Sequence, residues 1–147
     1  MKTKLTVYYW PQFLKDAYYR IVPLLKPHSH KYSHIWSPPR GGLSLGQILA
    51  YELSFKYYPK PPDSASTLIV DNTIDTGKTL SQFPKNDTFT IFYNKSACIR
   101  PTYPALYEQA EDEWIFFPWE NPEDLDDMPE GIRTLITPEV IKKLREF

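Results

Sequence analysis

The chain has 147 residues, with 17 Lys and Arg against 18 Asp and Glu, and its formal net charge is −1 at pH 7. This length is enough for one domain with a substantial core, so we expect a single domain over residues 1–147. A near-neutral chain lacks the basic surface that follows a phosphate backbone, so nucleic acid is not an expected partner. One cysteine excludes an internal disulfide. Without an evident signal peptide or long apolar span, we expect a cytoplasmic protein with no membrane association.

The amino-terminal segment is predicted to form a strand and then an amphipathic helix. Residues 5–10 are a β-branched and aromatic run, and Pro11 suits the first turn of a helix. Apolar residues then recur at three- and four-residue spacing, at Phe13, Leu14, Ala17, Tyr18, Ile21, Val22 and Leu25. Pro23 and Pro27 should distort and end this helix. The apolar stripe predicts packing rather than chemistry.

Three histidines, His28, His30 and His34, lie close together and suggest a metal site. No Cys, Asp or Glu lies between them, and the segment has the polar character of a surface connection. We therefore expect a solvated loop here, with His34 beginning the next strand at 34–37.

That strand leads into Pro-Pro-Arg-Gly-Gly at 38–42. Arg40 offers a charged fork, and Gly41 and Gly42 allow backbone amides to approach a ligand closely. A helix is predicted next, with its inner side formed by Leu45, Ile48, Leu49 and Leu53. By itself, Arg-Gly-Gly after a strand is equally compatible with an ordinary turn between a strand and a helix.

The most informative stretch is 67–80. Residues 68–70 form a short apolar run, typical of a strand buried on both faces, and acidic or amide side chains follow at Asp71, Asn72 and Asp75. The polar turn 76–79 should lead into a helix at 78–83 that Pro84 ends. Such a turn directs N–H groups inward and the helix adds a partial positive charge, so the loop can hold a phosphate monoester. The alternative is a strand, turn and helix of an unrelated α/β domain with capping Asp residues.

This stretch resembles the phosphoribosyl pyrophosphate (PRPP) motif of the type I phosphoribosyltransferases: an apolar strand, two acidic residues, then Asp-Thr-Gly-x-Thr. It departs only at Asn72, where the family usually has a second carboxylate. Arg-Gly-Gly at 40–42 is similar to the family's pyrophosphate loop. Residues 112–120, Asp-Glu-Trp-Ile-Phe-Phe-Pro-Trp-Glu, resemble the Asp-x-Trp-Ile-x-x-Pro-Trp-Asp segment of the bacterial xanthine-guanine enzymes. The resemblance covers most of residues 5–120.

The resemblance implies transfer of a 5-phosphoribosyl group from PRPP to a 6-oxopurine, with Mg²⁺ as cofactor and a dimer or tetramer as the assembly. It implies that the 5-phosphate is held by Asp75, Thr76, Gly77, Lys78 and Thr79. The ribose and metal are assigned to Asp71 and Asn72, with Asp71 as the metal ligand, and the pyrophosphate to Arg40, Gly41 and Gly42. The base is assigned to Lys95, Trp114 and Ile115. In this scheme Asp75 is the catalytic residue, beside N7 of the base.

The strand predictions, which end with residues 88–93, alternate with helices and indicate an α/β fold. The resemblance makes it a three-layer domain with a mainly parallel sheet flanked by helices. Between Leu53 and Thr67 the family inserts a hairpin whose flexible hood loop closes over the sugar. Here residues 54–66 are proline-rich, with a short edge strand expected at 55–58, so the hood loop is missing or much shortened. Transfer passes through an oxocarbenium-like sugar that water can trap, so an open site matters mechanistically.

The remaining segments predict structure rather than chemistry. Cys98 is expected to fill space, because no positively charged partner is evident. The acidic stretch 120–130 lacks the ligand spacing of a calcium loop and is expected to be a solvated connection rather than a calcium or magnesium site. Thr137 should cap a last helix, with Val140, Ile141 and Leu144 facing inward. This tail lies outside the resemblance and is a candidate for docking on a neighbouring subunit.

Two other functions remain open. A domain of this kind without a hood loop, and with one carboxylate replaced, is also compatible with a non-catalytic sensor of PRPP or a nucleotide. Hydrolysis or phosphorolysis of a nucleotide or nucleoside at the same open site is the third reading. The intact Arg-Gly-Gly turn, Asp75 and the Trp-Ile pair favour an enzyme, since a sensor needs neither a catalytic Asp nor a base platform.

Overall fold

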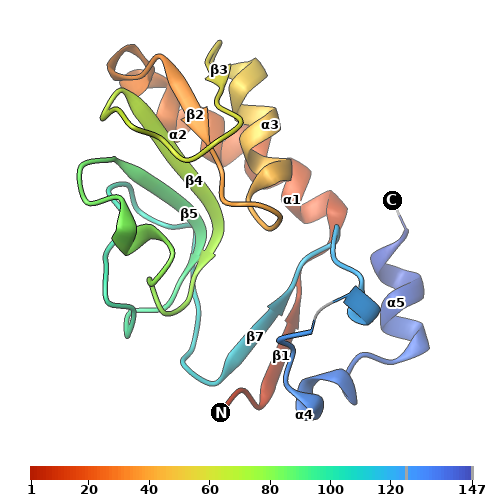
Figure 1. Ribbon diagram of the computed structural model, residues 1–147. Coiled ribbons are helices and arrows are strands. Elements are labelled where there is room, and N and C mark those ends of the chain that lie inside the picture. Colours follow the sequence, from red (N-terminus) through yellow and green to blue (C-terminus); the bar gives the residue numbers. More distant parts are fainter. Residues whose placement is uncertain (125, 147) are drawn as a thin grey trace.

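The computed structural model describes residues 1–124 and 126–146 (Figure 1). Its central sheet is parallel throughout, in the order β3-β2-β4-β5-β6. These strands are β2 (His34–Trp36), β3 (Lys56–Tyr57), β4 (Thr67–Ile74), β5 (Thr88–Tyr93) and β6 (Tyr107–Glu108). A second, two-stranded parallel sheet pairs β1 (Lys4–Val7) with β7 (Glu113–Phe116). The predicted α/β class with a mainly parallel sheet flanked by helices is confirmed.

The amino-terminal helix is longer than the prolines predict. It runs as α1 (Trp10–Asp16), a π-helical turn (Ala17–Ile21), α2 (Val22–Leu25) and a 3₁₀ helix (Lys26–Lys31). Pro23 lies near the start of α2, directly after the π-helical turn, where its missing N–H is accommodated without ending the helix. Pro27 begins the change to 3₁₀ geometry rather than ending the helix outright.

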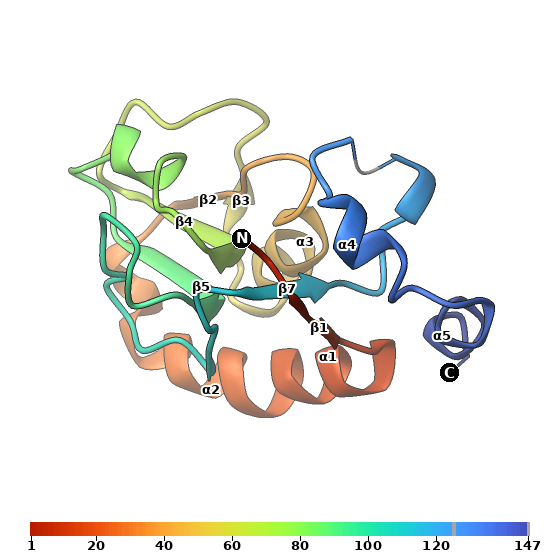
Figure 2. The same cartoon turned by 90° about the horizontal axis from the view of Figure 1, so that it is seen from below.

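The two faces of the central sheet pack differently. One face carries Ile35, Leu68, Val70 and Phe89 and buries them against the amino-terminal helix and α3 (Leu43–Glu52) (Figure 2). The other face carries Trp36 and Ile69 and is covered by loops and a single 3₁₀ turn, Leu80–Gln82. The helix predicted at 78–83 is therefore wrong in extent.

The connection between α3 and β4 is short. It contains only the two-residue edge strand β3 and the proline-rich loop that follows it. The expected absence of a hairpin and hood loop in this connection is thus confirmed.

The carboxyl-terminal segment packs on the small sheet. A 3₁₀ turn (Pro122–Asp124), α4 (Glu130–Arg133) and α5 (Pro138–Leu144) follow β7, and the two α-helices lie beside β1 and β7 (Figure 1). Phe116, Met128, Ile132 and Leu144 form its apolar cluster. The Thr137 hydroxyl caps α5 as expected by accepting the Val140 N–H, but Ile141 is 38% exposed and does not face inward.

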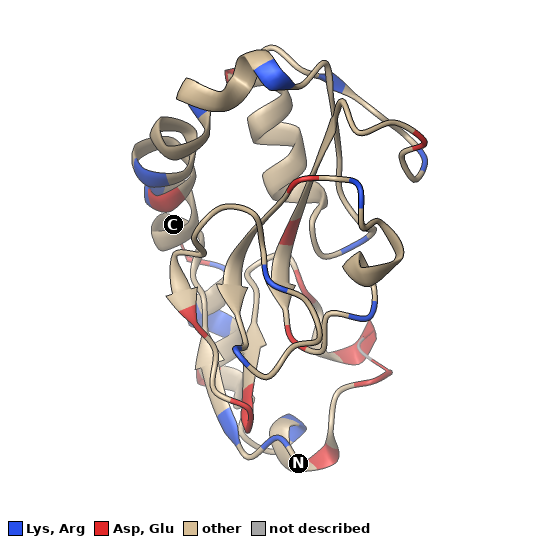
Figure 3. Ribbon diagram, turned by 90° about the vertical axis from the view of Figure 1, so that its left-hand side faces the viewer, with Lys and Arg blue, Asp and Glu red and all other residues tan. Residues whose placement is uncertain are grey.

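No helix among residues 1–124 and 126–146 is long and apolar enough to cross a bilayer. Figure 3 shows both basic and acidic residues spread over the ribbon.

Candidate functional site

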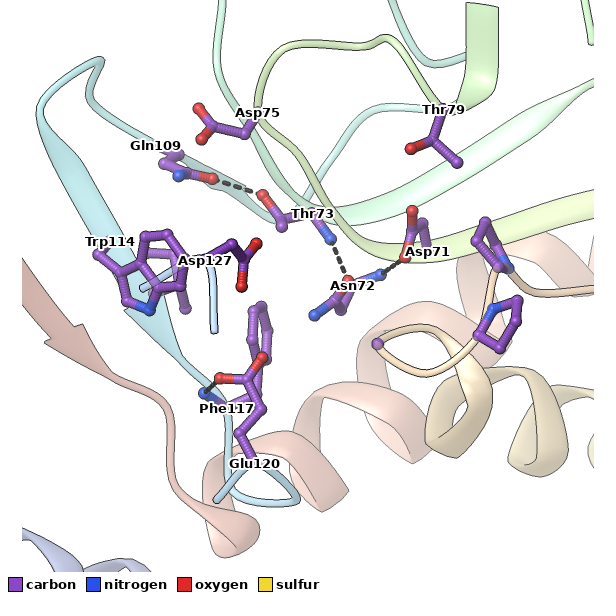
Figure 4. A pocket seen from close by; sticks show the side chains of 14 residues that line it. Asp71, Asn72, Thr73, Asp75, Thr79, Gln109, Trp114, Phe117, Glu120 and Asp127 are labelled. Atoms are coloured by element: carbon purple, nitrogen blue, oxygen red, sulfur yellow. Dashed lines mark hydrogen bonds between the residues drawn. The ribbon is translucent and has the colours of Figure 1, made fainter. Parts of the chain in front are cut away.

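A cavity of about 390 Å³ lies between the carboxyl edge of the central sheet and β7 (Figure 4). Parallel strands direct their loops to this edge, which is the usual ligand position in such sheets. Three segments far apart in sequence meet here: the turn after β2, the end of β4 with its loop, and β7 with the residues after it. The lining residues are Pro38, Pro39, Gly41, Asp71, Asn72, Thr73, Asp75, Thr79, Gln109, Trp114, Ile115, Phe117, Glu120 and Asp127.

Asp71 and Asn72 lie within β4 and not after its end. Asp71 and Thr73 still pair with β5, so the strand continues well past the predicted apolar run. Asp71 is 9% exposed and its Oδ1 accepts the Asn72 N–H at 2.8 Å. Burial of the carboxylate raises the pKa of Asp71 to about 7, which the hydrogen bond from Asn72 only partly offsets.

The turn before α3 approaches this strand closely. A Cβ built on Gly41 would lie 2.7 Å from Asn72 Oδ1, and one on Gly42 would lie 2.9 Å from the Val70 carbonyl oxygen and 3.2 Å from Asp71 Oδ1. Glycine is required at both positions for this approach. The Pro39–Arg40 peptide bond in the same turn is cis.

The predicted phosphate loop forms a separate recess of about 140 Å³ that opens beside Asp71, Thr73 and Asp75 and continues to Leu80. Gly77 has φ +84°, a conformation that favours glycine, and a Cβ there would lie 3.1 Å from Cys98 Sγ. Cys98 itself is exposed, so its predicted space-filling role is wrong, although its sulfur borders the loop. Only a 3₁₀ turn follows, so the loop lacks the helix N-terminus expected from the sequence.

Asp75 is held by two donors that sequence reasoning missed. Its Oδ1 accepts a hydrogen bond from Lys2 Nζ at 2.8 Å, in an ion pair, and another from Asn94 Nδ2 at 2.9 Å. Lys2 lies 73 residues away in sequence and precedes a different sheet. No local pattern in the chain indicates this contact.

The opposite wall of the cavity comes from β7 and the turn after it. Trp114 and Ile115 both line the cavity, as predicted for base-binding residues. The Trp114 indole also packs against the carboxyl-terminal cluster, and its buried Nε1 has no hydrogen-bond partner among the described residues. Trp119 instead stacks on Phe117, with ring centroids 5.2 Å apart, and belongs to the core.

Glu120 is a further cavity residue that the sequence did not single out. Its Oε2 accepts the Phe117 N–H at 3.0 Å, so the carboxyl group lies beside Phe117 on the cavity wall (Figure 4). Burial raises the pKa of Glu120 to about 7, and the nearby negative charge of Asp127 acts in the same direction. In the sequence Glu120 directly follows Pro-Trp, but its place at the start of the acidic stretch 120–130 predicts a solvated side chain instead.

Lys95 and Arg40 are two of the predicted site residues that line neither the main cavity nor the recess of the phosphate loop. Lys95 is exposed and its Nζ pairs with Glu108 Oε2 at 2.9 Å, so the structure does not bring it beside Trp114. Arg40 lines an adjacent cavity of about 260 Å³ together with Gly41, Trp119 and Glu120. Its guanidinium reaches the carbonyl oxygen of Asp124 at 3.5 Å.

The cavity offers limited protein ligands for a metal ion. Among the described residues, no group of three or more His, Cys, Asp and Glu side chains is arranged to hold one, and the three histidines form no such group. Asp71 is a single carboxylate beside an amide. This donor set fits Mg²⁺ held mainly by substrate phosphate and hydroxyl oxygens, with one protein carboxylate, rather than a site built by the protein alone.

Comparisons with known proteins give sequence matches over part of the chain. No family model matches the sequence. A segment of 63 residues is 38% identical to the xanthine-guanine phosphoribosyltransferase of Cereibacter sphaeroides, covering 40% of this chain and 36% of that protein. A 62-residue segment is 37% identical to the enzyme of the same name from Roseobacter denitrificans, covering 40% and 35%. The match thus spans about a third of the length of these relatives.

Solved structures match over most of the chain. A purine phosphoribosyltransferase from Pyrococcus horikoshii has a TM-score of 0.61 at 23% identity and covers 80% of this chain and 95% of its own. The xanthine-guanine-hypoxanthine phosphoribosyltransferase of Helicobacter pylori has a TM-score of 0.63 at 21% identity, covering 84% and 99%. A hypothetical protein from Neisseria gonorrhoeae with bound ppGpp has a TM-score of 0.52 at 16% identity, covering 86% and 94%.

The structural matches show that the chain has the type I phosphoribosyltransferase fold. The resemblance of its sequence to that family, and within it to the bacterial xanthine-guanine enzymes, is confirmed by the curated relatives.

Proposed function

We propose that this protein transfers the 5-phosphoribosyl group of PRPP to a 6-oxopurine such as xanthine, guanine or hypoxanthine, giving a nucleoside monophosphate and pyrophosphate. The observation that carries this proposal is the adjacency of three spaces. The main cavity, lined by the Trp-Ile segment, shares Gly41 and Glu120 with the cavity at Arg40, and shares Asp71, Thr73, Asp75 and Thr79 with the recess of the PRPP-like loop. Residue types suited to a phosphate, a sugar and a planar base therefore border neighbouring spaces, which supports the proposal.

The PRPP end of the site would use the loop after β4 and the turn after β2. In this scheme the recess at Thr76–Thr79 takes the 5-phosphate, and Asp71 and Asn72 face the ribose hydroxyls. The pyrophosphate would lie against Gly41 and extend toward Arg40 in the adjacent cavity. The close contact of Gly41 with Asn72 supports this arrangement, because it places the turn within reach of the same sugar.

The base would lie against Trp114, with its edge near the backbone of Ile115. A planar indole suits a planar heterocycle, and such a contact contributes roughly 0.5–1.5 kcal/mol beyond the area it buries. Asp75 would stand beside N7, where it takes the base's proton or stabilises the developing positive charge. The assignment of Lys95 to the 6-oxo group would require the lysine to leave Glu108.

Mg²⁺ is the proposed cofactor, and when bound it would neutralise charge on the departing pyrophosphate. Asp71 would be its protein ligand and must ionise to act as one. Asn72 can hydrogen-bond hydroxyls but adds no charge, so we expect weaker metal affinity than with two carboxylates. A dimer or tetramer and a cytoplasmic location are proposed from the same resemblance, and a neighbouring subunit would be the source of any cover over the open cavity.

Nucleotide binding without turnover is the second candidate. Asn72 and the missing hood loop both favour it, and one structural neighbour is a protein with bound ppGpp. Under this hypothesis the cavity would bind PRPP or a guanine nucleotide with no release of pyrophosphate.

The test is to incubate the protein with Mg²⁺, PRPP and each of several purines, and to follow nucleotide and pyrophosphate. Transfer predicts both products in equal amounts only when a base is present. Pyrophosphate without nucleotide would indicate hydrolysis, and binding by calorimetry without any product would indicate a sensor. Asp75→Asn should lower the transfer rate by ~10²–10⁴-fold, the usual range for a general acid–base group, while PRPP affinity stays within a few-fold. Unchanged turnover in that variant would refute the role of Asp75.

A further inference from the structure

Both hydrogen bonds that hold Asp75 fall on the same oxygen. Lys2 Nζ and Asn94 Nδ2 donate to Oδ1, at 2.8 and 2.9 Å. Among the described residues none bonds to Oδ2, and the Asp75 side chain lines the cavity. One carboxylate oxygen is therefore fixed and the other is left for a ligand.

Lys2 is unusually sequestered for a lysine. Its side chain is 16% exposed, although lysines are mostly solvated, and a partly buried ammonium needs a counterion. Its backbone position is set by the small sheet, because the Thr3 and Lys4 N–H groups both donate to the Asp112 carbonyl oxygen, at 2.8 and 3.0 Å. Lys2 therefore crosses from the β1–β7 sheet to the loop after β4.

Asn94 is equally constrained. It follows β5 directly, is 5% exposed, and its backbone N–H donates to the Ile74 carbonyl oxygen at 2.9 Å. Its Oδ1 accepts the Ser96 N–H at 2.9 Å, so the amide must present Nδ2 to Asp75. The two donors thus come from different sheets, and each is fixed by its own backbone.

We propose that Lys2 and Asn94 are positioning residues that hold Asp75 Oδ1 so that Oδ2 faces the imidazole ring of the purine; this inference rests on the proposed function. Reactive groups contribute most when their geometry is fixed before the substrate arrives. Lys2 has a second effect, because its charge offsets that of Asp75 beside a loop that must accept an anionic sugar phosphate. Lys2, which precedes the small sheet, thereby acts on Asp75, which follows β4 of the central sheet.

Lys4, the first residue of β1 and two positions after Lys2, provides a matched control. Its Nζ pairs with Asp112 at 3.2 Å, but its side chain is 68% exposed and does not reach the cavity. Replacing either lysine with Met keeps most of the apolar stem and removes one positive charge. Only Lys2→Met should disturb Asp75.

The experiment measures kcat and KM for PRPP and for the purine in the wild type, Lys2→Met, Lys2→Arg and Lys4→Met. Lys2→Met should lower kcat by about tenfold or more, part of the ~10²–10⁴-fold that the positioned carboxylate supplies. KM for PRPP should change less than about threefold, Lys2→Arg should recover part of the loss, and Lys4→Met should match the wild type. Melting curves confirm that each variant is folded.

A double variant tests whether Lys2 acts through Asp75. Lys2→Met should cause little further loss in an Asp75→Ala background, because a positioning residue has nothing left to position. Full additivity would overturn the inference, as would an unchanged kcat in Lys2→Met. A raised KM for PRPP with kcat unchanged would also overturn it and make Lys2 a phosphate ligand instead. An inactive wild type with every purine would overturn the proposed function itself, which is a separate result.

Discussion

The turn after β2 contacts β4 through Gly41, which packs against the amide side chain of Asn72. Gly41 is packed against Asn72 so tightly that any Cβ would overlap the amide, and neither group can retreat freely because Asn72 Oδ1 also accepts the Thr73 N–H at 3.0 Å. The turn and the strand therefore fix one another. A side chain at Gly41 should displace the turn that we assign to pyrophosphate, without removing any ligand atom.

We expect Gly41→Ala to weaken PRPP binding by at least about tenfold, which corresponds to about 1.4 kcal/mol. Gly131→Ala is the control, because a Cβ on Gly131 in α4 meets nothing within 4 Å. In a helix that substitution should stabilise the fold slightly, by roughly 0.5–1 kcal/mol. Calorimetric titration with PRPP and Mg²⁺ compares the two variants, and equal affinities would contradict the close-contact argument.

For single residues, the sequence indicates the site residues that belong to one local motif, but not those that are distant in the sequence and join the site only in the folded chain. Asp71, Asn72 and Asp75 are visible because they directly follow an apolar run. Lys2 is not, since it joins Asp75 only after two sheets have been placed side by side. For Lys95 the sequence predicts the position just after a strand correctly. It does not predict the direction of the side chain, because that depends on the ion pair with the exposed Glu108.

Among the elements, β4 and the turn after it depart most from expectation. Asp and Asn have low strand propensity, which predicts an end at Val70, yet pairing with β5 continues to Ile74. Pairing with β5 overrides the local preference, although β2 pairs with β4 only as far as Ile69. The predicted helix at 78–83 shrinks to one 3₁₀ turn before Pro84, and Leu80 anchors that turn in the cluster of Trp36 and Ile69.

Helix α5 gives a test of how the carboxyl-terminal segment is held. Leu144 is fully buried against Phe116 and Ile132, whereas Ile141 on the same helix is 38% exposed. Leu144→Ala should cost roughly 2–5 kcal/mol of unfolding free energy, the usual range for a buried leucine. Ile141→Ala should cost less than about 1 kcal/mol.

Chemical denaturation measures both variants on α5. Similar losses would mean that the helix does not pack on the β1–β7 sheet in the way described. The comparison also concerns the cavity, because Phe116 follows Trp114 and Ile115 on the same strand, and loosening the cluster should move the wall that these two residues form.

In the whole molecule, the cavity is a gap between two sheets that are joined by polar contacts. Besides the Lys2–Asp75 pair, Thr73 hydrogen-bonds to Gln109, whose amide donates to the Glu113 carbonyl oxygen at 3.0 Å. These links join the two walls of the cavity, the one from β4 and the one from β7. Because the connection after β3 contains no hood loop, the cavity is bounded by the two sheets and their adjoining turns rather than by a cover from that connection.

The buried acids on those walls predict how the stability of the whole protein depends on pH. Burial raises the pKa of Asp71 and of Glu120 to about 7, well above the ordinary values of 3.8 and 4.5. Between about pH 4 and pH 7 the folded protein therefore binds more protons at these sites than the unfolded chain does. Stability contributed by these sites must then fall as the pH rises through that window and level off above it.

We expect unfolding in urea, without divalent cations, to show this contribution as a difference between wild type and variant. Each unit of raised pKa corresponds to about 1.4 kcal/mol, so ionising each of the two acids should cost on the order of a few kcal/mol. Asp71→Asn and Glu120→Gln keep the shape but cannot ionise, and should therefore gain stability relative to the wild type at about pH 8 and little at about pH 5. Parallel pH profiles for the wild type and both variants would show that these carboxyl groups titrate as solvated ones, and that water enters the space between the two sheets.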